Sequence, residues 1–341
     1  MANLKLKNIK KSFADQVALD DLNLDIADGE FFVILGHTGS GKTTTLRCIA
    51  GLERPEQGEI YMDDELISDM TPANRDVAFV FQEHILYPHM TVYENMAFPL
   101  HTRGYSESEI NSKVVEIAEM LHIEHLLERQ PSQLSGGETQ RVGLGRAMVR
   151  QPKVFLMDEP ISALDAKLRA EMRSEIRLRQ RQTGITTLYV THDQTEAMSM
   201  ADKIVLMNEG HIVQQGKPKE LFENPSHMFT AKFLGNPPMN IIETQHDGET
   251  HFINHNGEKI DFRQDNKKDL VFGLRPEDIK VSDKGIKCNV NFLDYQGSET
   301  IINTTLGIHE INIKTDSKKT DDLNQEIYIK WNKKDIKVFE K

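Results

Sequence analysis

A glycine-rich segment at residues 36–43, GHTGSGKT, has the residue types and the spacing needed to hold a chain of phosphates. Its glycines allow successive backbone N–H groups to turn inward around an anion. The apolar run at 31–35 indicates a buried strand before it, and residues 44–50 indicate a helix after it, whose N-terminus adds partial positive charge. Lys42 can reach the β- and γ-phosphates, and the Thr43 hydroxyl can bind Mg²⁺. The predicted phosphate contacts come from Gly36, His37, Thr38, Gly39, Ser40, Gly41, Lys42, Thr43 and Thr44.

Two adjacent carboxylates, Asp158 and Glu159, follow a second apolar run at residues 153–157. Neighbouring side chains point in different directions at the end of a strand. Asp158 can therefore join the Mg²⁺ ligands while Glu159 faces the water that attacks the γ-phosphate. Taken alone, the pair fits an acidic turn at the end of a core strand equally well. Beside the phosphate-binding segment, it predicts an NTPase in which Glu159 activates the water.

A third segment at residues 134–141, LSGGETQR, precedes an amphipathic run that extends to Val149. Ser135 is a natural N-cap, and Glu138 three residues later completes a capping box. Gly136 and Gly137 leave the first N–H groups of the helix bare, which makes a second anion site. Because one nucleotide needs only one cradle, we expect this half-site to serve the nucleotide held by another copy of the chain. An ordinary capped helix is the alternative.

Four further positions complete a set of motifs, and the set resembles the nucleotide-binding subunit of an ABC transporter. Phe13 lies where that family has an adenine-stacking aromatic residue, and Gln82 matches the Q-loop glutamine. Residues 162–165, SALD, match the D-loop with Asp165, and His192 matches the switch histidine. The resemblance covers roughly the first 235 residues without a gap in motif order, which is far more specific than any single motif. By residue type alone, Phe13 could also be a core phenylalanine.

The resemblance implies a role for each of these positions. Glu159 would polarise the attacking water, His192 would contact the γ-phosphate, and Gln82 would sense both metal and phosphate. The implied ligands of Mg²⁺ are Thr43, Gln82 and Asp158. The implied contacts to ATP are Phe13, the phosphate-binding segment, Ser135, Gly136, Gly137, Glu138 and Asp165. This sequence departs from the family in two places, because Glu138 replaces the usual glutamine and His37 a more usual proline.

The composition argues against several classes of protein. The formal net charge of -12 disfavours a general nucleic-acid binder. Only two cysteines occur, Cys48 and Cys288, which suits a reducing cytosol rather than a disulfide scaffold. The N-terminus lacks the apolar stretch of a secretion signal, and no apolar run approaches about 18 residues, so we expect membrane association only through other proteins. A series of arginines shares one helix face, and nearby Glu171 and Glu175 favour a solvated, partly paired face. The series is Arg169, Arg173, Arg177 and Arg181.

We expect an α/β fold with two domains. Residues 1–235 should form an ABC-type P-loop NTPase domain, with an antiparallel layer near its start and a helical subdomain inserted at about residues 83–150. The helical spacing within that insertion is carried by Ile110, Val114, Ile117 and Leu121. Beyond a linker-like break at residues 235–238, short β-type runs and turn signals predict a small all-β, OB-like accessory domain at residues 236–341.

Two segments relate to partners and cargo through the resemblance. Residues 85–90 are apolar and aromatic, and by resemblance they help to form a cleft for a short helix of a membrane permease. Local packing of the helical subdomain explains this stretch equally well. Residues 272–278, with Met239 and Asn240, resemble the accessory domain of import ATPases of the maltose and multiple-sugar type.

These resemblances imply an ATP-hydrolysing subunit that energises an importer, with carbohydrate as the favoured cargo. We expect a homodimer, or a pair with another ATPase subunit, that lies peripherally on the cytoplasmic face of the cell membrane. Membrane permease subunits are the expected direct partners and a solute-binding protein an indirect one, while nucleic acid is not an expected partner. Glycerol phosphate, a polyol or a polyamine are alternative cargoes. A soluble ABC ATPase that acts on ribosomes or DNA, or a regulatory ATP sensor, are alternative functions.

Overall fold

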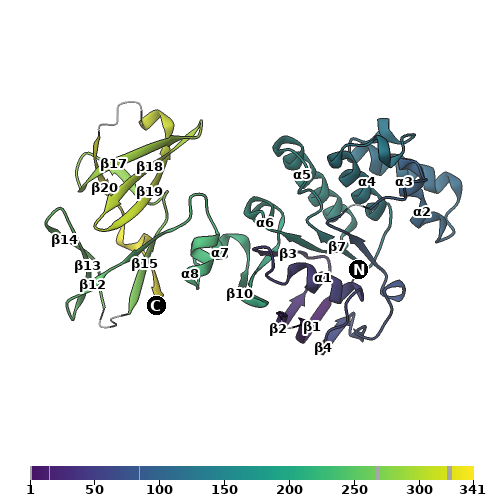
Figure 1. Ribbon diagram of the computed structural model, residues 1–341, viewed down its shortest axis with the longest axis horizontal. Coiled ribbons are helices and arrows are strands. Elements are labelled where there is room, and N and C mark those ends of the chain that lie inside the picture. Colours follow the sequence, from purple (N-terminus) through teal and green to yellow (C-terminus); the bar gives the residue numbers. More distant parts are fainter. Residues whose placement is uncertain (1, 15, 84, 266, 268, 321–324) are drawn as a thin grey trace. The chain divides into compact units, whose positions relative to one another are not determined.

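The computed structural model describes residues 2–14, 16–83, 85–265, 267, 269–320 and 325–341 of the chain. They form two compact units that divide between Lys219 and Glu220, and each unit has its own hydrophobic core (Figure 1). The division falls earlier in the chain than the predicted domain boundary at residues 235 and 236. None of the helices formed by the described residues combines the length and apolar character that a membrane crossing requires.

A six-stranded sheet forms the centre of the first unit, in the order β10-β9-β3-β8-β7-β6 (Figure 1). Its strands are β3 (Phe31–Gly36), β6 (Val77–Val80), β7 (Val154–Asp158), β8 (Thr186–Thr191), β9 (Lys203–Asn208) and β10 (His211–Gly216). All neighbouring pairs are parallel except β9 and β10, and every residue of β3, β7 and β8 is buried. Because β3, β8 and β7 are adjacent, their carboxyl ends share one edge, where ligands bind in open α/β sheets.

The predicted antiparallel layer is present as a second sheet in the order β2-β1-β4-β5. Its strands are β1 (Leu4–Phe13), β2 (Gln16–Ile26), β4 (Gln57–Met62) and β5 (Glu65–Leu66). Helix α1 (Lys42–Ala50) shares one buried cluster with both sheets, in which Leu46 of the helix joins Leu4 of β1 and Ile34 of β3. The phosphate-binding segment therefore connects a buried strand to a helix whose own position is fixed by the core.

The region between β6 and β7 is helical, as predicted. Its helices are α2 (Val92–His101), α3 (Glu107–Met120) and α4 (Gly136–Met148), with short 3-10 helices at Glu124–Leu126 and Pro131–Gln133 between α3 and α4. A further 3-10 helix at Pro72–Asn74 precedes β6. The stripe predicted for α3 is confirmed, because Ile110, Val114 and Ile117 are buried. Capping boxes begin α2 at Thr91 and α4 at Ser135. Helices α5 (Ala166–Thr183) and α6 (Gln194–Met200) follow β7 and β8.

The arginine face of α5 is partly paired, but the partners of Arg169 and Arg177 are not the glutamates on the same helix. Arg177 forms an ion pair with Asp202, and its guanidinium lies 5.2 Å from the ring centroid of Phe31. Arg169 donates hydrogen bonds to backbone carbonyls outside the helix and pairs with Asp193 at 3.6 Å. These partners lie on other elements of the unit, whereas the prediction considered only charges on the helix itself.

The second unit begins within helix α7 (Pro218–Glu223), continues with α8 (Met228–Phe233), and is otherwise built from antiparallel strands. Its three sheets have the orders β11-β15-β21, β12-β13-β14 and β16-β20-β17-β18-β19. The strands are β11 (Asn240–Glu243), β12 (Gln245–His246), β13 (Thr250–His255), β14 (Glu258–Gln264), β15 (Leu270–Leu274), β16 (Lys280–Ser282), β17 (Ile286–Tyr295), β18 (Glu299–Leu306), β19 (His309–Asp316), β20 (Glu326–Lys330) and β21 (Lys337–Glu340), with 3-10 helices at Ser317–Lys319 and Lys333–Asp335. Asn256 and Gly257, with φ of 51° and 83°, make the turn between β13 and β14. The antiparallel β class predicted for this part of the chain is confirmed.

Arg275 ties helices α7 and α8 to the strands of the second unit. Its guanidinium donates to the backbone oxygens of Phe222, at 2.8 Å, and of Leu234. It also lies 4.0 Å from the centroid of the Phe222 ring, and burial lowers the pKa of Arg275. Because these carbonyls precede the break at residues 235–238, the compact division of the chain falls before α8 and not at that break.

Candidate active site

The phosphate-binding loop has a backbone shape that requires glycine at two positions and tight packing at a third. Gly39 and Gly41 have φ of 83° and 100°, in the region that disfavours other residues. A Cβ at Gly41 would lie 2.5 Å from the backbone oxygen of Ala18, and one at Gly36 would lie 2.4 Å from that of Met207. The loop can therefore come close to a ligand through its backbone, with Gly41 directly before α1.

Lys42 is almost completely buried at the start of α1. Its ammonium donates to the backbone oxygens of Gly36 at 2.9 Å and His37 at 2.8 Å. Burial lowers the pKa of Lys42, and the charges of Glu159 and Asp158 oppose that effect. The two direct partners of this desolvated ammonium are neutral carbonyl oxygens. A polyphosphate bound in the loop would supply a negative charge next to it.

Thr43 and Asp158 bring two oxygen ligands together at the edge of the sheet. The Thr43 hydroxyl donates to Oδ1 of Asp158 at 3.1 Å, across the gap between α1 and the end of β7. Asp158 is 2% exposed, and burial raises its pKa against the opposing effect of the Thr43 hydrogen bond. A buried carboxylate beside a hydroxyl suits Mg²⁺, which takes few protein ligands and several oxygens from phosphate and water. The described residues contain no cluster of three or more His, Cys, Asp or Glu able to hold a metal.

Glu159 is the point at which the predicted catalytic side chains meet. Its Oε1 lies 2.9 Å from Nδ1 of His192, and its Oε2 accepts a hydrogen bond from Nε2 of Gln82 at 3.3 Å. The backbone of Glu159 has φ of 47°, an uncommon conformation for a residue with a side chain. Its N–H donates to the backbone oxygen of Val190 at 3.0 Å, which fixes the turn against β8.

Gln140 holds the other side of this turn and was not among the predicted site residues. It is 1% exposed on α4, and its Nε2 donates to the backbone oxygen of Glu159 at 3.2 Å. Its Oε1 accepts a hydrogen bond from the N–H of Ala163 at 2.9 Å. The sequence does contain a signal for this residue, because Gln140 shares a buried stripe of α4 with Leu144 and Met148 at spacings of four. A glutamine on a buried stripe requires polar partners.

A cavity of about 460 Å³ lies over the loop and the catalytic side chains. It is lined by Phe13, Gln16, Ala18, Thr38, Gly39, Gly41, Lys42, Thr43, Thr44, Gln82, Glu159 and His192. Phe13 is 43% exposed, so it is not the core residue that its type alone allowed. Gln16 and Ala18 were not predicted, and their neutral character on an antiparallel strand gave no signal. The predicted residues that do not line this cavity are Gly36, His37, Ser40, Ser135, Gly136, Gly137, Glu138, Asp158 and Asp165.

Comparison with known proteins places the chain in a family. A family model described as "ABC transporter" matches residues 19–162. The trehalose/maltose import ATP-binding protein MalK of Thermococcus litoralis is 44% identical over 334 residues, which cover 90% of this chain and 89% of that protein. This chain belongs to the ABC transporter family. The chain is thus an ABC-type ATPase, an enzyme that binds and hydrolyses ATP.

Two further proteins are similar to this ABC-type ATPase. The sn-glycerol-3-phosphate import ATP-binding protein UgpC of Bordetella bronchiseptica is 42% identical over 326 residues, covering 94% of this chain and 90% of that protein. A dimeric solved structure, the post-hydrolysis state of the ATP-binding cassette MJ0796 bound to ADP and Pi, is 33% identical with a TM-score of 0.59. That likeness covers 63% of this chain and 98% of the solved chain.

The predicted second anion site lies at the start of α4, and its residues do not line the cavity. The N–H and hydroxyl of Ser135 both donate to Oε2 of Glu138, each at 2.7 Å. These hydrogen bonds lower the pKa of Glu138, so its carboxylate stays charged at the helix start. Asp165 caps α5 by accepting a hydrogen bond from the N–H of Leu168 at 3.0 Å. Ser135, Glu138 and Asp165 do not line the cavity over the loop.

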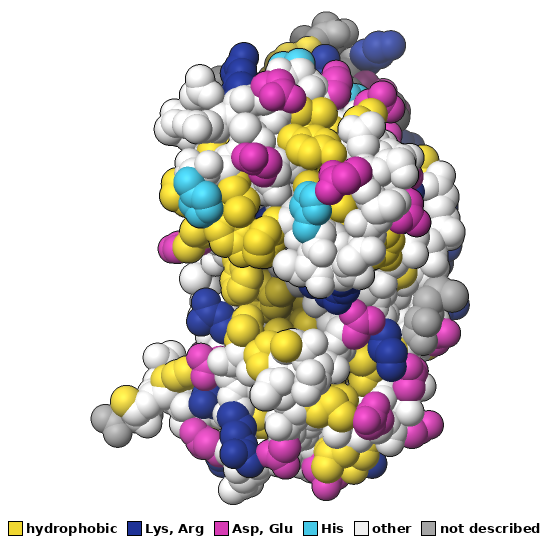
Figure 2. All heavy atoms as spheres, turned by 90° about the vertical axis from the view of Figure 1, so that its right-hand side faces the viewer, with side chains coloured by type: hydrophobic (Ala, Val, Ile, Leu, Met, Phe, Trp, Pro, Cys, Tyr) yellow, Lys and Arg dark blue, Asp and Glu magenta, His cyan; other side chains and the backbone are white. Residues whose placement is uncertain are grey.

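A hollow lined by both apolar and charged side chains lies beside the site. Figure 2 looks onto the side of the first unit that carries α2, α3 and α4, and it shows hydrophobic side chains gathered along a hollowed strip. A cavity of about 520 Å³ is lined by Arg47, Phe81, Gln82, Glu83, Ile85, Leu86, Tyr87, Arg146 and Asp158. Ile85 is 74% exposed, and Arg146 donates to its backbone oxygen at 2.9 Å. Local packing therefore does not cover Ile85, and Gln82 lines both this hollow and the nucleotide cavity.

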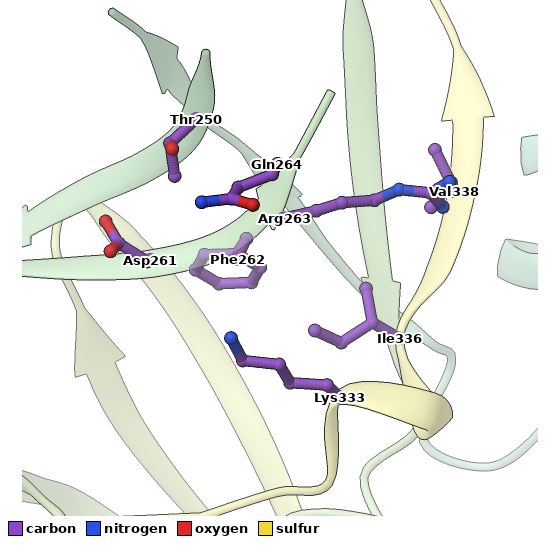
Figure 3. A pocket seen from close by; sticks show the side chains of 8 residues that line it. All are labelled: Thr250, Asp261, Phe262, Arg263, Gln264, Lys333, Ile336 and Val338. Atoms are coloured by element: carbon purple, nitrogen blue, oxygen red, sulfur yellow. The ribbon is translucent and has the colours of Figure 1, made fainter. Parts of the chain in front are cut away.

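Another cavity, of about 430 Å³, lies in the second unit and contains none of the predicted site residues. It is lined by Thr250, Asp261, Phe262, Arg263, Gln264, Lys333, Ile336 and Val338 (Figure 3). Phe262 and Ile336 form its apolar side, and Lys333 and Gln264 reach into it.

Proposed function

We propose that this chain is the ATP-hydrolysing subunit of a solute importer, with carbohydrate as its cargo and Mg²⁺ as its metal. The observation that carries the chemistry is the convergence of Glu159, His192 and Gln82 beside the phosphate-binding loop. The cargo class is supported by the similarity to MalK, named a trehalose/maltose import ATP-binding protein, over 90% of this chain. That extent includes the second unit, whose residues 272–278 carry the resemblance to import ATPases.

Residues in and beside the cavity position ATP and water. The glycines and Lys42 hold the β- and γ-phosphates, Phe13 stacks on the adenine, and Thr43, Asp158 and Gln82 hold Mg²⁺. Bound Mg²⁺ supplies a Lewis acid that neutralises charge on the γ-phosphate.

Hydrolysis then follows from the position of Glu159. Its carboxylate takes a proton from water while the water oxygen forms a bond to the γ-phosphorus. The bond from that phosphorus to the bridging oxygen breaks, and its electron pair stays on ADP. His192 orients the Glu159 carboxylate through Nδ1 and contacts the γ-phosphate. The products are ADP and inorganic phosphate.

The working enzyme is a dimer in which each nucleotide lies between two copies. Ser135, Gly136, Gly137 and Glu138 of one copy complete the cavity of the other, and Asp165 contributes across the same seam. This explains why a phosphate-binding helix start exists outside the cavity lining. In such a dimer ATP binds the closed state more tightly than the open one, and that difference drives closure.

Closure is coupled to a permease on the cytoplasmic face of the membrane, where this chain lies peripherally. The hollow around Ile85 receives a permease segment, and Gln82 links it to the nucleotide cavity. In this proposal residues 1–235 are the ATPase domain, and residues 236–341 are an accessory domain for dimer contacts or regulation. Glycerol phosphate is the second candidate cargo, because the similarity to UgpC extends over 94% of this chain.

The variant Glu159→Gln tests the catalytic proposal. We expect ATP turnover to fall by about 10²-fold or more, the range lost when a general base is removed, while ATP binding persists and an ATP-bound dimer accumulates. Glu175→Gln on α5 is the matched control and should hydrolyse ATP like the unaltered chain. Normal hydrolysis by Glu159→Gln would remove this residue from its role.

A mixing experiment tests the shared sites. Lys42→Ala disables the phosphate loop of one copy, and Ser135→Arg blocks the half-site of another. Each variant alone should be inactive, whereas their mixture forms some dimers with one intact composite site and recovers part of the activity. Absence of recovery, despite mixed dimers detected by cross-linking, would refute the shared-site proposal.

Stimulation of ATPase activity by maltodextrins, but not by glycerol 3-phosphate, in vesicles with the permease and binding protein would identify the cargo class.

A further inference from the structure

Arg169 joins two parts of the active site that carry different catalytic residues. It lies in the first turns of α5, just after the segment 162–165, and its Nη2 donates to the backbone oxygens of Ser162 at 3.2 Å and Leu164 at 2.8 Å. Its Nη1 lies 3.6 Å from Oδ2 of Asp193, the residue that follows His192. One side chain thus bridges the D-loop segment and the switch-histidine turn.

The D-loop side of this bridge is connected directly to Glu159. The N–H and the hydroxyl of Ser162 both donate to the backbone oxygen of Glu159, at 3.3 Å and 3.1 Å. Arg169 in turn holds the carbonyl of the same Ser162. A displacement of residues 162–165 therefore moves the acceptors of Arg169 together with the turn that carries Glu159.

The other side of the bridge is rigid around His192. The N–H of Asp193 donates to Oγ1 of Thr191 at 2.9 Å, and the Thr191 hydroxyl donates to the buried carboxylate of Glu196 at 2.8 Å. Asp193 also caps α6 by accepting hydrogen bonds from the N–H groups of Thr195 and Glu196. A displacement of the Asp193 carboxylate therefore also shifts the backbone on either side of His192.

The position of Arg169 is not one that helix stability alone would select. The first turn of α5 has no acidic residue, and a positive charge near a helix N-terminus is unfavourable with the macrodipole. Its Nε is also buried without a hydrogen-bond partner among the described residues, which adds a cost. The planar guanidinium can reach two carbonyls and a carboxylate at once, which the point charge of a lysine cannot do.

We propose that Arg169 is a positioning residue that couples the D-loop segment to His192, so that docking of a second copy against residues 162–165 sets the switch histidine. The inference rests on the proposed function, because it takes Glu159 and His192 as the catalytic pair and the dimer as the active form. Arg169 itself does not line the nucleotide cavity. Its loss should therefore lower kcat and leave the KM for ATP unchanged.

The test compares Arg169→Met, Arg169→Lys, Asp193→Asn and the double variant Arg169→Met with Asp193→Asn. Asn remains a good N-cap, so Asp193→Asn removes the charge while the cap of α6 is kept. We expect Arg169→Met to lower kcat about tenfold, the effect of losing about one hydrogen bond of a charged group, and to leave the KM for ATP unchanged. Arg169→Lys should restore only part of the rate, and the double variant should be no slower than Arg169→Met. Arg181→Met, an exposed arginine at the far end of α5, is the matched control.

Dimer trapping separates coupling from a loss of folding. In the Glu159→Gln background, Arg169→Met should reduce the fraction of ATP-bound dimer, although its melting temperature stays close to that of the control. An unchanged kcat for Arg169→Met, or additive losses in the double variant, would overturn the inference while the proposed function survives. Normal hydrolysis by Glu159→Gln itself would instead overturn the proposed function.

Discussion

Replacing Gln140 by leucine probes how α4 supports the catalytic turn. The change removes the hydrogen bond from Nε2 to the Glu159 carbonyl and leaves the N–H of Ala163 without the acceptor that it has at 2.9 Å. The hydrogen bond lost by the Glu159 carbonyl costs about 1 kcal/mol, and the N–H left without an acceptor costs about 1–3 kcal/mol. Burial of the leucine methyl groups returns about 1 kcal/mol. We therefore expect the free energy of unfolding to fall by about 1–3 kcal/mol.

The effect on catalysis should be larger than this loss of stability suggests. Glu159 keeps its uncommon φ of 47° only because the surrounding contacts hold it, and such a backbone stores about 1–3 kcal/mol. Without Gln140 the turn can relax, and a catalytic group displaced by about 1 Å loses about 10²-fold in rate. The KM for ATP should change little, because Gln140 is not part of the cavity lining.

Thermal unfolding and steady-state ATP hydrolysis check these expectations on the same preparation. A change of about 1–3 kcal/mol corresponds to a fall in Tm of about 2–12 °C for a unit of this size. Gln182→Leu, an exposed glutamine on α5, is the matched control and should alter neither quantity. If Gln140→Leu lowers Tm but retains the kcat of the unaltered chain at a temperature where both are folded, Gln140 is only a structural residue and the reasoning is refuted.

Two further predictions concern charges. Burial raises the pKa of Asp158 above its ordinary value of 3.8, so the ionised carboxylate destabilises the folded chain at neutral pH, and this cost disappears as the pH falls towards that value. Asp158→Asn should therefore raise Tm by a few degrees at pH 7 without Mg²⁺, and this increase should become smaller as the pH is lowered. The same variant should lose Mg²⁺-dependent hydrolysis. An unchanged or lower Tm at pH 7 would contradict the prediction. Glu138→Gln keeps a capping box, because glutamine also fits that motif, but removes a negative charge from the second anion site. The KM for ATP should fall about two- to fivefold, equivalent to about 0.5–1 kcal/mol for a partly exposed charge, and a KM that rises would place Glu138 away from the phosphates.

Local signals in the sequence were sufficient for the loop and the helix starts. The glycines of residues 36–43 and the box of Ser135 with Glu138 depend on neighbours a few residues away, and the structure reproduces both. The meeting of Glu159 with His192 was also predictable, although 33 residues separate them. Both follow buried strands, and carboxyl ends of adjacent parallel strands share one edge. The shared edge of adjacent parallel strands was therefore enough to predict this contact, although the two residues are distant in the sequence.

The supporting residues were not predictable by the same route. Gln140 reaches the backbone of Glu159 from another helix, and backbone acceptors leave no trace in a residue pattern. Arg275 is similar, since it binds the carbonyls of Phe222 and Leu234 and so moves the compact division ahead of the break at 235–238. Glycine and proline mark where a chain can bend. Which compact unit a neighbouring helix joins depends on tertiary contacts, such as those of Arg275 with backbone carbonyls.

Arg169 shows the same limit for charges on a helix. The spacing of four residues in the arginine series gave a face, and Glu171 and Glu175 offered partners of the usual local kind. The actual partners are Asp193, which follows β8, and two carbonyls before α5, all brought close by the order β8-β7 in the sheet. A salt bridge to a local glutamate would be worth about 0.3–0.5 kcal/mol, whereas hydrogen bonds from a half-buried guanidinium to fixed acceptors are worth about 1.5–3 kcal/mol. The tertiary contacts are therefore more stabilising than a local ion pair with a glutamate. They place Arg169 where it can affect the position of the active-site residues.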